Sequence, residues 1–122
     1  MSKYKKQKTA LIIGRWQPWH KGHRWLIDNR LKKGKNVLIC IRDMPTDQNN
    51  PFTPIEVKNK IEDELRSFVD EGKIKVIIIP DIESVNYGRG VGYDIIEHVP
   101  PNAIGKISAT NIRKKLLNDS KK

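Results

Sequence analysis

Two histidines, His20 and His23, lie in the segment Gly14–His23, whose sequence is GRWQPWHKGH. Imidazole nitrogens donate hydrogen bonds to phosphate oxygens, and a spacing of three residues places both rings roughly on one face of a helix. Gly22 between them removes a side chain beside a ligand. A zinc site needs three or four ligands, and His98 is the only other histidine in the sequence. The segment therefore favours a phosphate site over a metal site.

The pattern around this segment places it between a strand and a helix. Residues 9–14 form a short apolar run typical of a buried parallel strand, and residues 21–31 show a helical pattern that ends before Gly34. Free backbone N–H groups at a helix N-terminus attract phosphate, and open α/β sheets bind ligands at this edge. The sequence matches neither the P-loop nor the GxGxxG pattern of dinucleotide-binding folds. A different phosphate motif is therefore required.

Two further apolar runs, residues 36–42 and 74–80, predict two more strands of the same sheet. A second helix is predicted from Pro54 to about Val69, and Thr53 with Glu56 forms a capping box at its start. Strands that alternate with helices predict an α/β fold, a Rossmann-like parallel sheet with helices on both faces.

The last third of the sequence has a looser pattern. It predicts a short helix around residues 93–98, a brief strand near residues 104–107 and a final helix that begins at Ser108.

The composition restricts the class of protein. The 122 residues have a formal net charge of +10, which indicates an anionic partner, although much of this charge lies in lysine clusters near the two ends of the sequence. No apolar run approaches the length of about 20 residues that spans a membrane. The single cysteine, Cys40, excludes a disulfide framework. We expect a cytoplasmic protein with one domain over residues 1–122, a basic N-terminal tail at residues 1–8 and no membrane partner. So small a core also makes a homodimer a reasonable hypothesis.

The residues of the first segment resemble a known signature. GRxQPxHxGH is similar to the HxGH signature of the nucleotidyltransferase superfamily, which includes adenylyltransferases and cytidylyltransferases. A second segment, ISATNIR at residues 107–113, resembles the ISxTxxR motif of the same superfamily. NPFT at residues 50–53 and IPDI at residues 79–82 resemble segments of archaeal-type nicotinamide mononucleotide adenylyltransferases, so this likeness covers roughly the first two thirds of the chain.

The resemblance implies a reaction and a set of roles. A nucleoside monophosphate, AMP in preference to CMP, would pass from a nucleoside triphosphate with its Mg²⁺ to a small phosphorylated acceptor, and pyrophosphate would leave. No protein ligand for the metal is predicted. The implied catalytic residues are His20, His23 and Arg113. The implied nucleotide-binding residues are Gly14, Arg15, Trp16, Lys21, Gly22, Ser108 and Thr110.

Four further residues are candidate contacts to the acceptor or the base. Arg42 and Asp43 are candidates because they follow the second predicted strand, and Tyr87 and Arg89 because they lie in the glycine-rich sequence YGRGVGY. The chain departs from the nicotinamide-type pattern after Ile82, which leaves the acceptor open.

Two alternatives remain at this stage. One is a CTP-dependent cytidylyltransferase that acts on a phosphorylated alcohol. The other is a non-enzymatic module that binds nucleotides or nucleic acid through its basic charge. Nucleic acid is not the expected partner, because two phosphate motifs at separate strand ends do not require it. Salt separates the classes, since binding to nucleic acid weakens steeply as salt rises.

Overall fold

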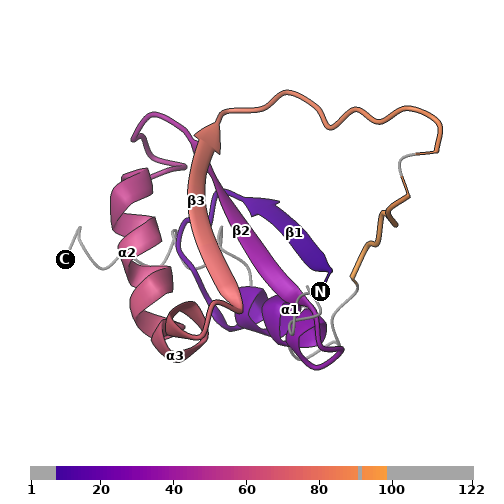
Figure 1. The fold of residues 1–122 in the computed structure, drawn as a ribbon. Coiled ribbons are helices and arrows are strands. Elements are labelled where there is room, and N and C mark those ends of the chain that lie inside the picture. Colours follow the sequence, from indigo (N-terminus) through magenta and orange to yellow (C-terminus); the bar gives the residue numbers. More distant parts are fainter. Residues whose placement is uncertain (1–7, 91, 99–122) are drawn as a thin grey trace.

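A computed structural model describes residues 8–90 and 92–98. Its elements, in chain order, are β1 (Thr9–Gly14), α1 (Lys21–Leu31), β2 (Asn36–Asp43), α2 (Pro54–Glu64), α3 (Arg66–Asp70) and β3 (Ile74–Pro80) (Figure 1). The strands form one parallel sheet in the order β1-β2-β3. The predicted α/β class with a parallel sheet is confirmed.

The register brings the carboxyl ends of the strands to one edge of the sheet. Gly14, the last residue of β1, is paired with Ile41, and Asp43, the last residue of β2, is paired with Pro80. Helix α1 begins after β1 and α2 begins after β2, so both helix N-termini belong to this edge. The fold therefore collects the residues that follow each strand in one region.

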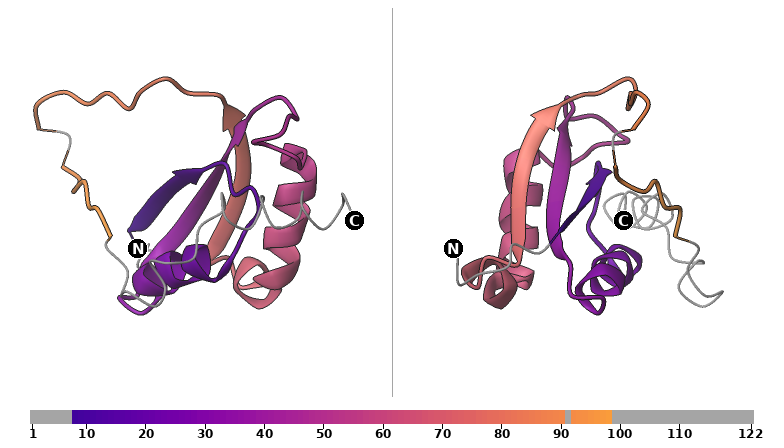
Figure 2. Two further views of the ribbon diagram at one scale, coloured as in Figure 1. Left: turned by 180° about the vertical axis from the view of Figure 1, so that it is seen from behind. Right: turned by 45° about the vertical axis from the view of Figure 1, so that its right-hand side comes forward.

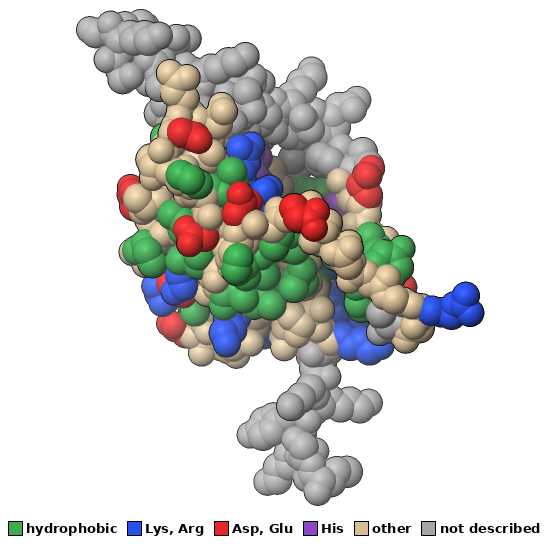
Figure 3. Space-filling model, turned by 90° about the horizontal axis from the view of Figure 1, so that it is seen from above, with side chains coloured by type: hydrophobic (Ala, Val, Ile, Leu, Met, Phe, Trp, Pro, Cys, Tyr) green, Lys and Arg blue, Asp and Glu red, His purple; other side chains and the backbone are tan. Residues whose placement is uncertain are grey.

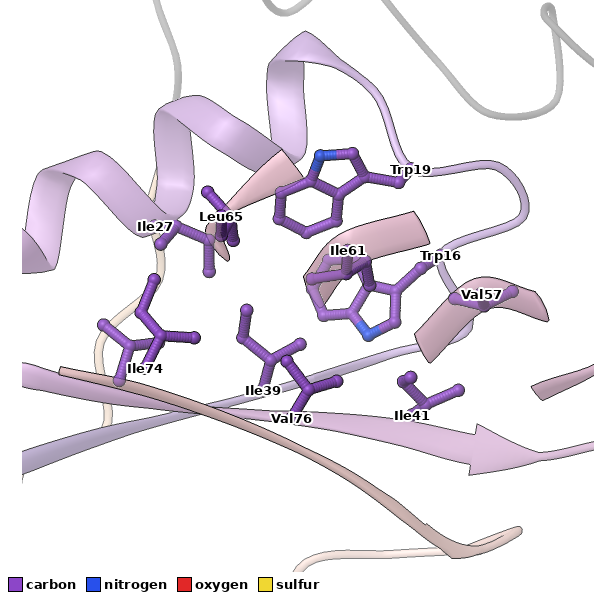
Figure 4. Close-up of a cluster of buried hydrophobic side chains, with 11 residues drawn as sticks. Trp16, Trp19, Ile27, Ile39, Ile41, Val57, Ile61, Leu65, Ile74 and Val76 are labelled. Atoms are coloured by element: carbon purple, nitrogen blue, oxygen red, sulfur yellow. The ribbon is translucent and has the colours of Figure 1, made fainter. Parts of the chain in front are cut away.

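The core lies between the sheet and its helices. Ile39, Ile41 and Ile61 are completely buried, and Val76 packs in the same cluster. Figure 4 shows side chains of α1 and α2 above the strands, with the rings of Trp16 and Trp19 between them. The strands are rich in Ile and Val because β-branched side chains pack well on a pleated surface.

Helices α1 and α2 contribute to this single cluster on one face of the sheet (Figure 4). The prediction of helices on both faces is therefore not met within the described residues. The strand order explains this result. Successive crossovers of the same hand that proceed in one direction across a sheet place their helices on the same face. Helices reach the other face only where the strand order reverses, and β1-β2-β3 contains no reversal.

The predicted second helix is divided into α2 and α3. Thr53 and Glu56 form the expected capping box, in which the Glu56 backbone N–H donates to Thr53 Oγ1 (3.2 Å) and the Thr53 N–H donates to Glu56 Oε1 (3.2 Å). Leu65 departs from helical geometry with φ −106° and ψ 25°. This break separates the two helices while the Leu65 side chain stays buried in the core.

The chain after β3 has no helix at residues 92–98, so that sequence-based prediction is wrong. Ile95 and Ile96 are more than half exposed and have no core to cover. A segment of this length cannot support a helix without such packing. The chain from residue 81 leaves the end of β3 and extends away from the sheet before it returns towards α1 (Figures 1 and 2). The strand and helix predicted after residue 103 lie outside the described residues.

The helices of the described residues lack the length and apolar character of a membrane span.

Replacing Thr53 by alanine tests the role of the α2 cap. The change removes the oxygen that accepts from the Glu56 N–H, so the unfolding free energy falls by about 1 kcal/mol and the melting temperature by roughly 4–8 °C. Calorimetry measures this loss. Ser67→Ala is the matched control, because Ser67 is exposed within α3 and its side chain makes no hydrogen bond in the described residues. Equal effects of the two changes would contradict the capping role.

Candidate functional site

Two histidines cap the start of α1. His20 is the N-cap residue, and its Nδ1 accepts a hydrogen bond from the Gly22 backbone N–H (3.0 Å). His23 lies at the third helical position, and its Nδ1 accepts from the His20 backbone N–H (3.1 Å). This is a reciprocal capping box in which imidazoles replace the usual hydroxyl and carboxylate groups. The two rings stack with centroids 3.7 Å apart and planes 19° apart.

The capping contacts fix the proton of each neutral ring. An imidazole that accepts at Nδ1 carries its hydrogen on Nε2. In the part of the chain that is described, no hydrogen bond involves Nε2 of His20 or His23. Each ring therefore keeps an N–H donor at the end of β1 and the start of α1, where an anion is favoured.

Both histidines are held in the neutral form. Burial lowers the pKa of His20 from its ordinary value. Burial, and then the neighbouring His20, lower the pKa of His23 from 6.5 to about 3. Stacked rings cannot both hold a positive charge at low cost. At neutral pH the pair is therefore an uncharged double donor.

The rings of Trp16 and Trp19 pack against the His23 ring. The Trp16 ring meets the His23 ring edge-on with centroids 4.7 Å apart, and the Trp19 ring lies 5.6 Å from it. Each indole N–H has an acceptor: Trp16 Nε1 donates to the Cys40 carbonyl (3.1 Å), and Trp19 Nε1 donates to a carboxylate oxygen of Glu64. Both tryptophans are buried, each with 5% of its surface exposed. The orientation of His23 is thus set by aromatic packing as well as by its backbone contact.

Gly14 lies against the Trp16 ring. A Cβ at this position would lie 3.0 Å from atoms of that ring, so a larger residue would need the buried indole to shift by a few tenths of an ångström. Trp16 itself has a left-handed backbone with φ 55°, an unfavourable conformation for a bulky residue. Strain of this kind persists only where the surroundings impose it, and it concentrates at functional sites.

Gln17 joins the histidine loop to the segment that precedes α2. Its side-chain Nε2 donates to the Phe52 carbonyl (2.8 Å), and its Oε1 accepts from the Phe52 N–H (2.9 Å). Two residues earlier in the loop, Arg15 Nη1 donates to Asn50 Oδ1 (3.4 Å). Gln17 and Asn50 are buried polar residues, so these bonds satisfy groups that burial would otherwise penalise. The two segments form one unit.

At the end of β2, the Arg42 guanidinium is held by Asp81. Its Nε and Nη2 both donate to Asp81 Oδ1, at 3.0 and 2.7 Å. Asp43 is exposed at the last position of the strand. Figure 3 views this end and shows carboxylates among hydrophobic side chains. Arg42 is therefore near the expected edge, but it is already paired.

The structure brings together only part of the predicted site. Its contiguous part is the loop and first turn of α1, with Gly14, Arg15, Trp16, His20, Lys21, Gly22 and His23. Tyr87 and Arg89 lie in the exposed segment after β3, where the Tyr87 ring contacts Tyr93 at 6.4 Å. No contact in the described residues joins them to the histidines. Ser108, Thr110 and Arg113 lie outside the described residues.

Sequence reasoning missed three supporting residues. The sequence places Gln17 in the first motif without indicating what it does, and it indicates no role in the site for Asn50 or Glu64. Gln17 and Asn50 occur in the two motif segments GRWQPWHKGH and NPFT, and this coincidence was the available signal that the segments touch. Nothing in the sequence indicated Glu64, which reaches Trp19 from 45 positions away.

A resident metal site is not formed by the described residues, since none of their His, Cys, Asp and Glu side chains gather in a group of three or more. Cys40 is buried in β2, and burial raises the pKa of its thiol.

No protein-family model matches the sequence. The chain is 30% identical over 92 residues to an uncharacterised protein of Aeropyrum pernix, an alignment covering 75% of this chain and 54% of that protein. It is 33% identical over 84 residues to a nicotinamide-nucleotide adenylyltransferase of Thermoplasma acidophilum, covering 67% of this chain and 45% of the relative. The chain thus spans about half the length of the curated relatives it matches.

Solved structures agree with these relatives. The chain superposes with TM-scores of 0.54 and 0.55 on two structures of a bifunctional NMN adenylyltransferase/ADP ribose pyrophosphatase from Francisella tularensis, one of them complexed with AMP and a manganese ion. The identity is 31%, and the match covers 62% of this chain and 23% of the larger protein. These similarities support the nucleotidyltransferase superfamily and a Rossmann-like α/β fold.

The lowered pKa of His23 predicts a pH dependence of stability. The unfolded chain binds a proton at His23 near pH 6.5 and the folded chain only near pH 3. Between these values the unfolded state holds more protons, so the unfolding free energy falls as pH decreases, by at most about 1.4 kcal/mol per pH unit from this group. Above pH 6.5 the contribution is constant.

His23→Gln removes this titration and keeps an oxygen that can accept from the His20 N–H. Denaturant unfolding at about pH 7 and about pH 4.5 therefore shows a larger loss for the natural protein than for the variant. A loss of equal size in both proteins would show that His23 does not titrate in this way.

Replacing Gln17 by leucine tests the link between the two segments. The Phe52 N–H and carbonyl lose their partners, and the unfolding free energy falls by about 2 kcal/mol or more. Gln48→Leu is the control, because Gln48 is exposed and makes no side-chain hydrogen bond within the described chain. Urea denaturation of both variants measures the difference, and a Gln17→Leu protein as stable as the control would remove the structural role of this residue.

Proposed function

We propose that the chain is a nucleotidyltransferase that transfers AMP from ATP to a small phosphorylated acceptor and releases pyrophosphate. The observation that carries the proposal is the pair of stacked, neutral histidines at the start of α1. Both rings are fixed through Nδ1, and both keep an Nε2–H donor at the carboxyl edge of the sheet. The similarity to adenylyltransferases supports the same reaction class.

The proposed reaction is a displacement at phosphorus. An anionic oxygen of the acceptor attacks the α-phosphorus of ATP, a new P–O bond forms, and the bond to the β-phosphate breaks so that pyrophosphate leaves with its electron pair. No protein nucleophile is needed, and Mg²⁺ enters as part of the nucleotide substrate. Catalysis then depends on positioning and on stabilising charge around the phosphorus.

The residues divide this work by their place in the fold. His20 and His23 donate to oxygens of the reacting phosphate, and the backbone at Gly22 allows a close approach. Gly14 and Trp16 form the wall at the end of β1, while Arg15 and Lys21 add positive charge. Because the histidines start neutral, they bind the triphosphate as donors without displacing a counterion. The resemblance assigns the outer phosphates to Ser108, Thr110 and Arg113. Acceptor or base contacts are proposed for Arg42 and Asp43 from their position at the end of β2, and for Tyr87 and Arg89 from their place in the glycine-rich segment.

ATP is the proposed nucleotide. The relative from Thermoplasma acidophilum is named as an adenylyltransferase, and the structure from Francisella tularensis was obtained with AMP. The acceptor is proposed as a phosphorylated small molecule, since a phosphate oxygen can attack without first losing a proton.

Variants of His20 separate phosphate binding from folding. Asparagine and aspartate both retain a side-chain oxygen that caps α1, and an acid at a helix N-terminus is favourable. Both variants should therefore be as stable as the natural protein. His20→Asn weakens MgATP binding by about tenfold, and His20→Asp by roughly a hundredfold or more, because its carboxylate repels the phosphates.

Titration calorimetry with MgATP and MgCTP gives the affinities, and pyrophosphate release with a panel of phosphorylated acceptors gives the activity. The natural protein should prefer ATP and release pyrophosphate only with an acceptor present. Unchanged ATP affinity in a folded His20→Asp variant would overturn the site, and equal or greater activity with CTP would overturn the choice of nucleotide.

A further inference from the structure

The charges of the folded part are distributed unequally between its two ends. At the carboxyl edge of the sheet, Arg42 is paired with Asp81. The exposed carboxylate of Asp43 ends β2, and those of Asp47 and Glu83 lie on the segments that follow β2 and β3. Figure 3 views this end and shows acidic side chains dispersed over it. The opposite end carries a different set of groups.

At the amino ends of the strands, five cationic residues lie close together, and we call them the basic end. They are Lys8, Arg30, Lys32, Lys33 and Lys35. The fold brings them together from separate elements. The Lys35 N–H donates to the Arg30 carbonyl at the end of α1 (3.1 Å), and the Asn36 N–H donates to the Lys8 carbonyl before β1 (3.2 Å).

The turn between α1 and β2 has a shape that exposes these groups. Gly34 adopts a left-handed conformation with φ 73°, which reverses the chain directly after Lys32 and Lys33. Both lysines and Lys8 are exposed, and Lys35 is half-buried. None of the five residues lines the pocket formed by Trp16, Trp19 and neighbouring residues of α2.

None of these five side chains forms an ion pair with a carboxylate in residues 8–90 or 92–98. Other cations of the same fold do: Arg24 with Asp28, Lys58 with Glu62, and Arg66 with Asp63. Arg30 also has a buried Nε with no hydrogen-bond partner, although its Nη2 donates to Asn29 Oδ1 (3.2 Å). Within the described residues, no carboxylate pairs with the positive charges at this end.

The α1 dipole accounts for only part of this charge. A helix C-terminus presents about half of an elementary negative charge, which one lysine in the last turn is enough to offset. The positive charges of the basic end also act on His98, whose ring centroid lies 6.4 Å from that of Trp25 on α1. Burial, and then the charges of Arg30 and Lys33, lower the pKa of His98.

We propose that the basic end binds the sugar–phosphate backbone of nucleic acid, at a surface separate from the histidine site. An uncompensated positive surface spread over one helix end and two strand starts fits an extended polyanion better than a small phosphate, which needs converging donors. A surface that inserts into a membrane would need large exposed hydrophobic side chains among its cationic residues. The large hydrophobic side chains that are exposed within the described residues lie outside this helix end and turn. The sequence suggested charge in the terminal segments, whereas the structure places an unpaired cluster in the folded part.

The test compares two triple variants of the full chain with the same change in net charge. Lys32→Gln, Lys33→Gln and Lys35→Gln neutralise the basic end, and the control neutralises Lys58, Lys60 and Arg66 on α2 and α3. Fluorescence anisotropy with a labelled mixed-sequence DNA duplex is measured over a series of salt concentrations. The plot of log K against log salt has a negative slope, and each lost phosphate contact makes its magnitude smaller by about 0.9.

We expect the basic-end variant to lose roughly tenfold or more in affinity at low salt, with a slope smaller by about 2–3, while the control stays within about twofold. MgATP affinity should be unchanged in both variants, which keeps this result distinct from the test of the histidine site. Equal weakening in the two variants would show attraction by net charge alone and overturn the proposal. Absence of duplex binding by the natural protein would overturn the proposal as well. Binding to vesicles of anionic lipid is measured in parallel, and a basic-end variant that loses affinity for the vesicles but not for the duplex would also overturn it.

Discussion

The burial of two tryptophans beneath the loop after β1 is the interaction on which the site depends. Trp16 and Trp19 fill the space between α1, α2 and the sheet, and their indole N–H groups are satisfied by the Cys40 carbonyl and by Glu64. Without this packing the loop would have no fixed path from β1 to α1. Gly14, the left-handed backbone of Trp16 and the contact with His23 are all consequences of placing these large rings inside. The core and the histidine site are thus built from the same residues.

This overlap changes the meaning of the histidine motif. His20 and His23 have a structural role as capping residues of α1 that does not depend on any ligand. Their Nδ1 atoms satisfy backbone N–H groups that the helix leaves unpaired. An alanine at position 23 would remove a cap, an aromatic contact and a donor together. Substitutions that keep the cap are therefore the ones that isolate the chemistry. In each ring Nδ1 stabilises the start of the helix, which leaves Nε2 for the anion that we propose binds there.

Much of the fold could be predicted from the sequence. The bounds of β1, α1 and β3, and the cap of α2, follow from local patterns: continuous Ile and Val runs, a helix closed by Gly34, and Thr53 with Glu56. The break at Leu65, the absence of a helix at residues 92–98 and the helices on one face depend on which surfaces find partners, and no local pattern records that. In the site, the identity of the histidines was visible, but the Arg42–Asp81 pair and the Gln17–Phe52 link join residues 39 and 35 positions apart. Such contacts become visible only once the strands are aligned.

The three tryptophans of the chain are not equivalent as spectroscopic probes. Two of them, Trp16 and Trp19, lie against His23, whereas Trp25 lies on α1 beside His98. Indole emission responds to the charge and polarity of its surroundings, so any event that alters the histidine rings will change the light emitted by the two buried tryptophans. The natural protein therefore contains an optical reporter at the start of α1 and needs no added label to reveal whether that site is occupied.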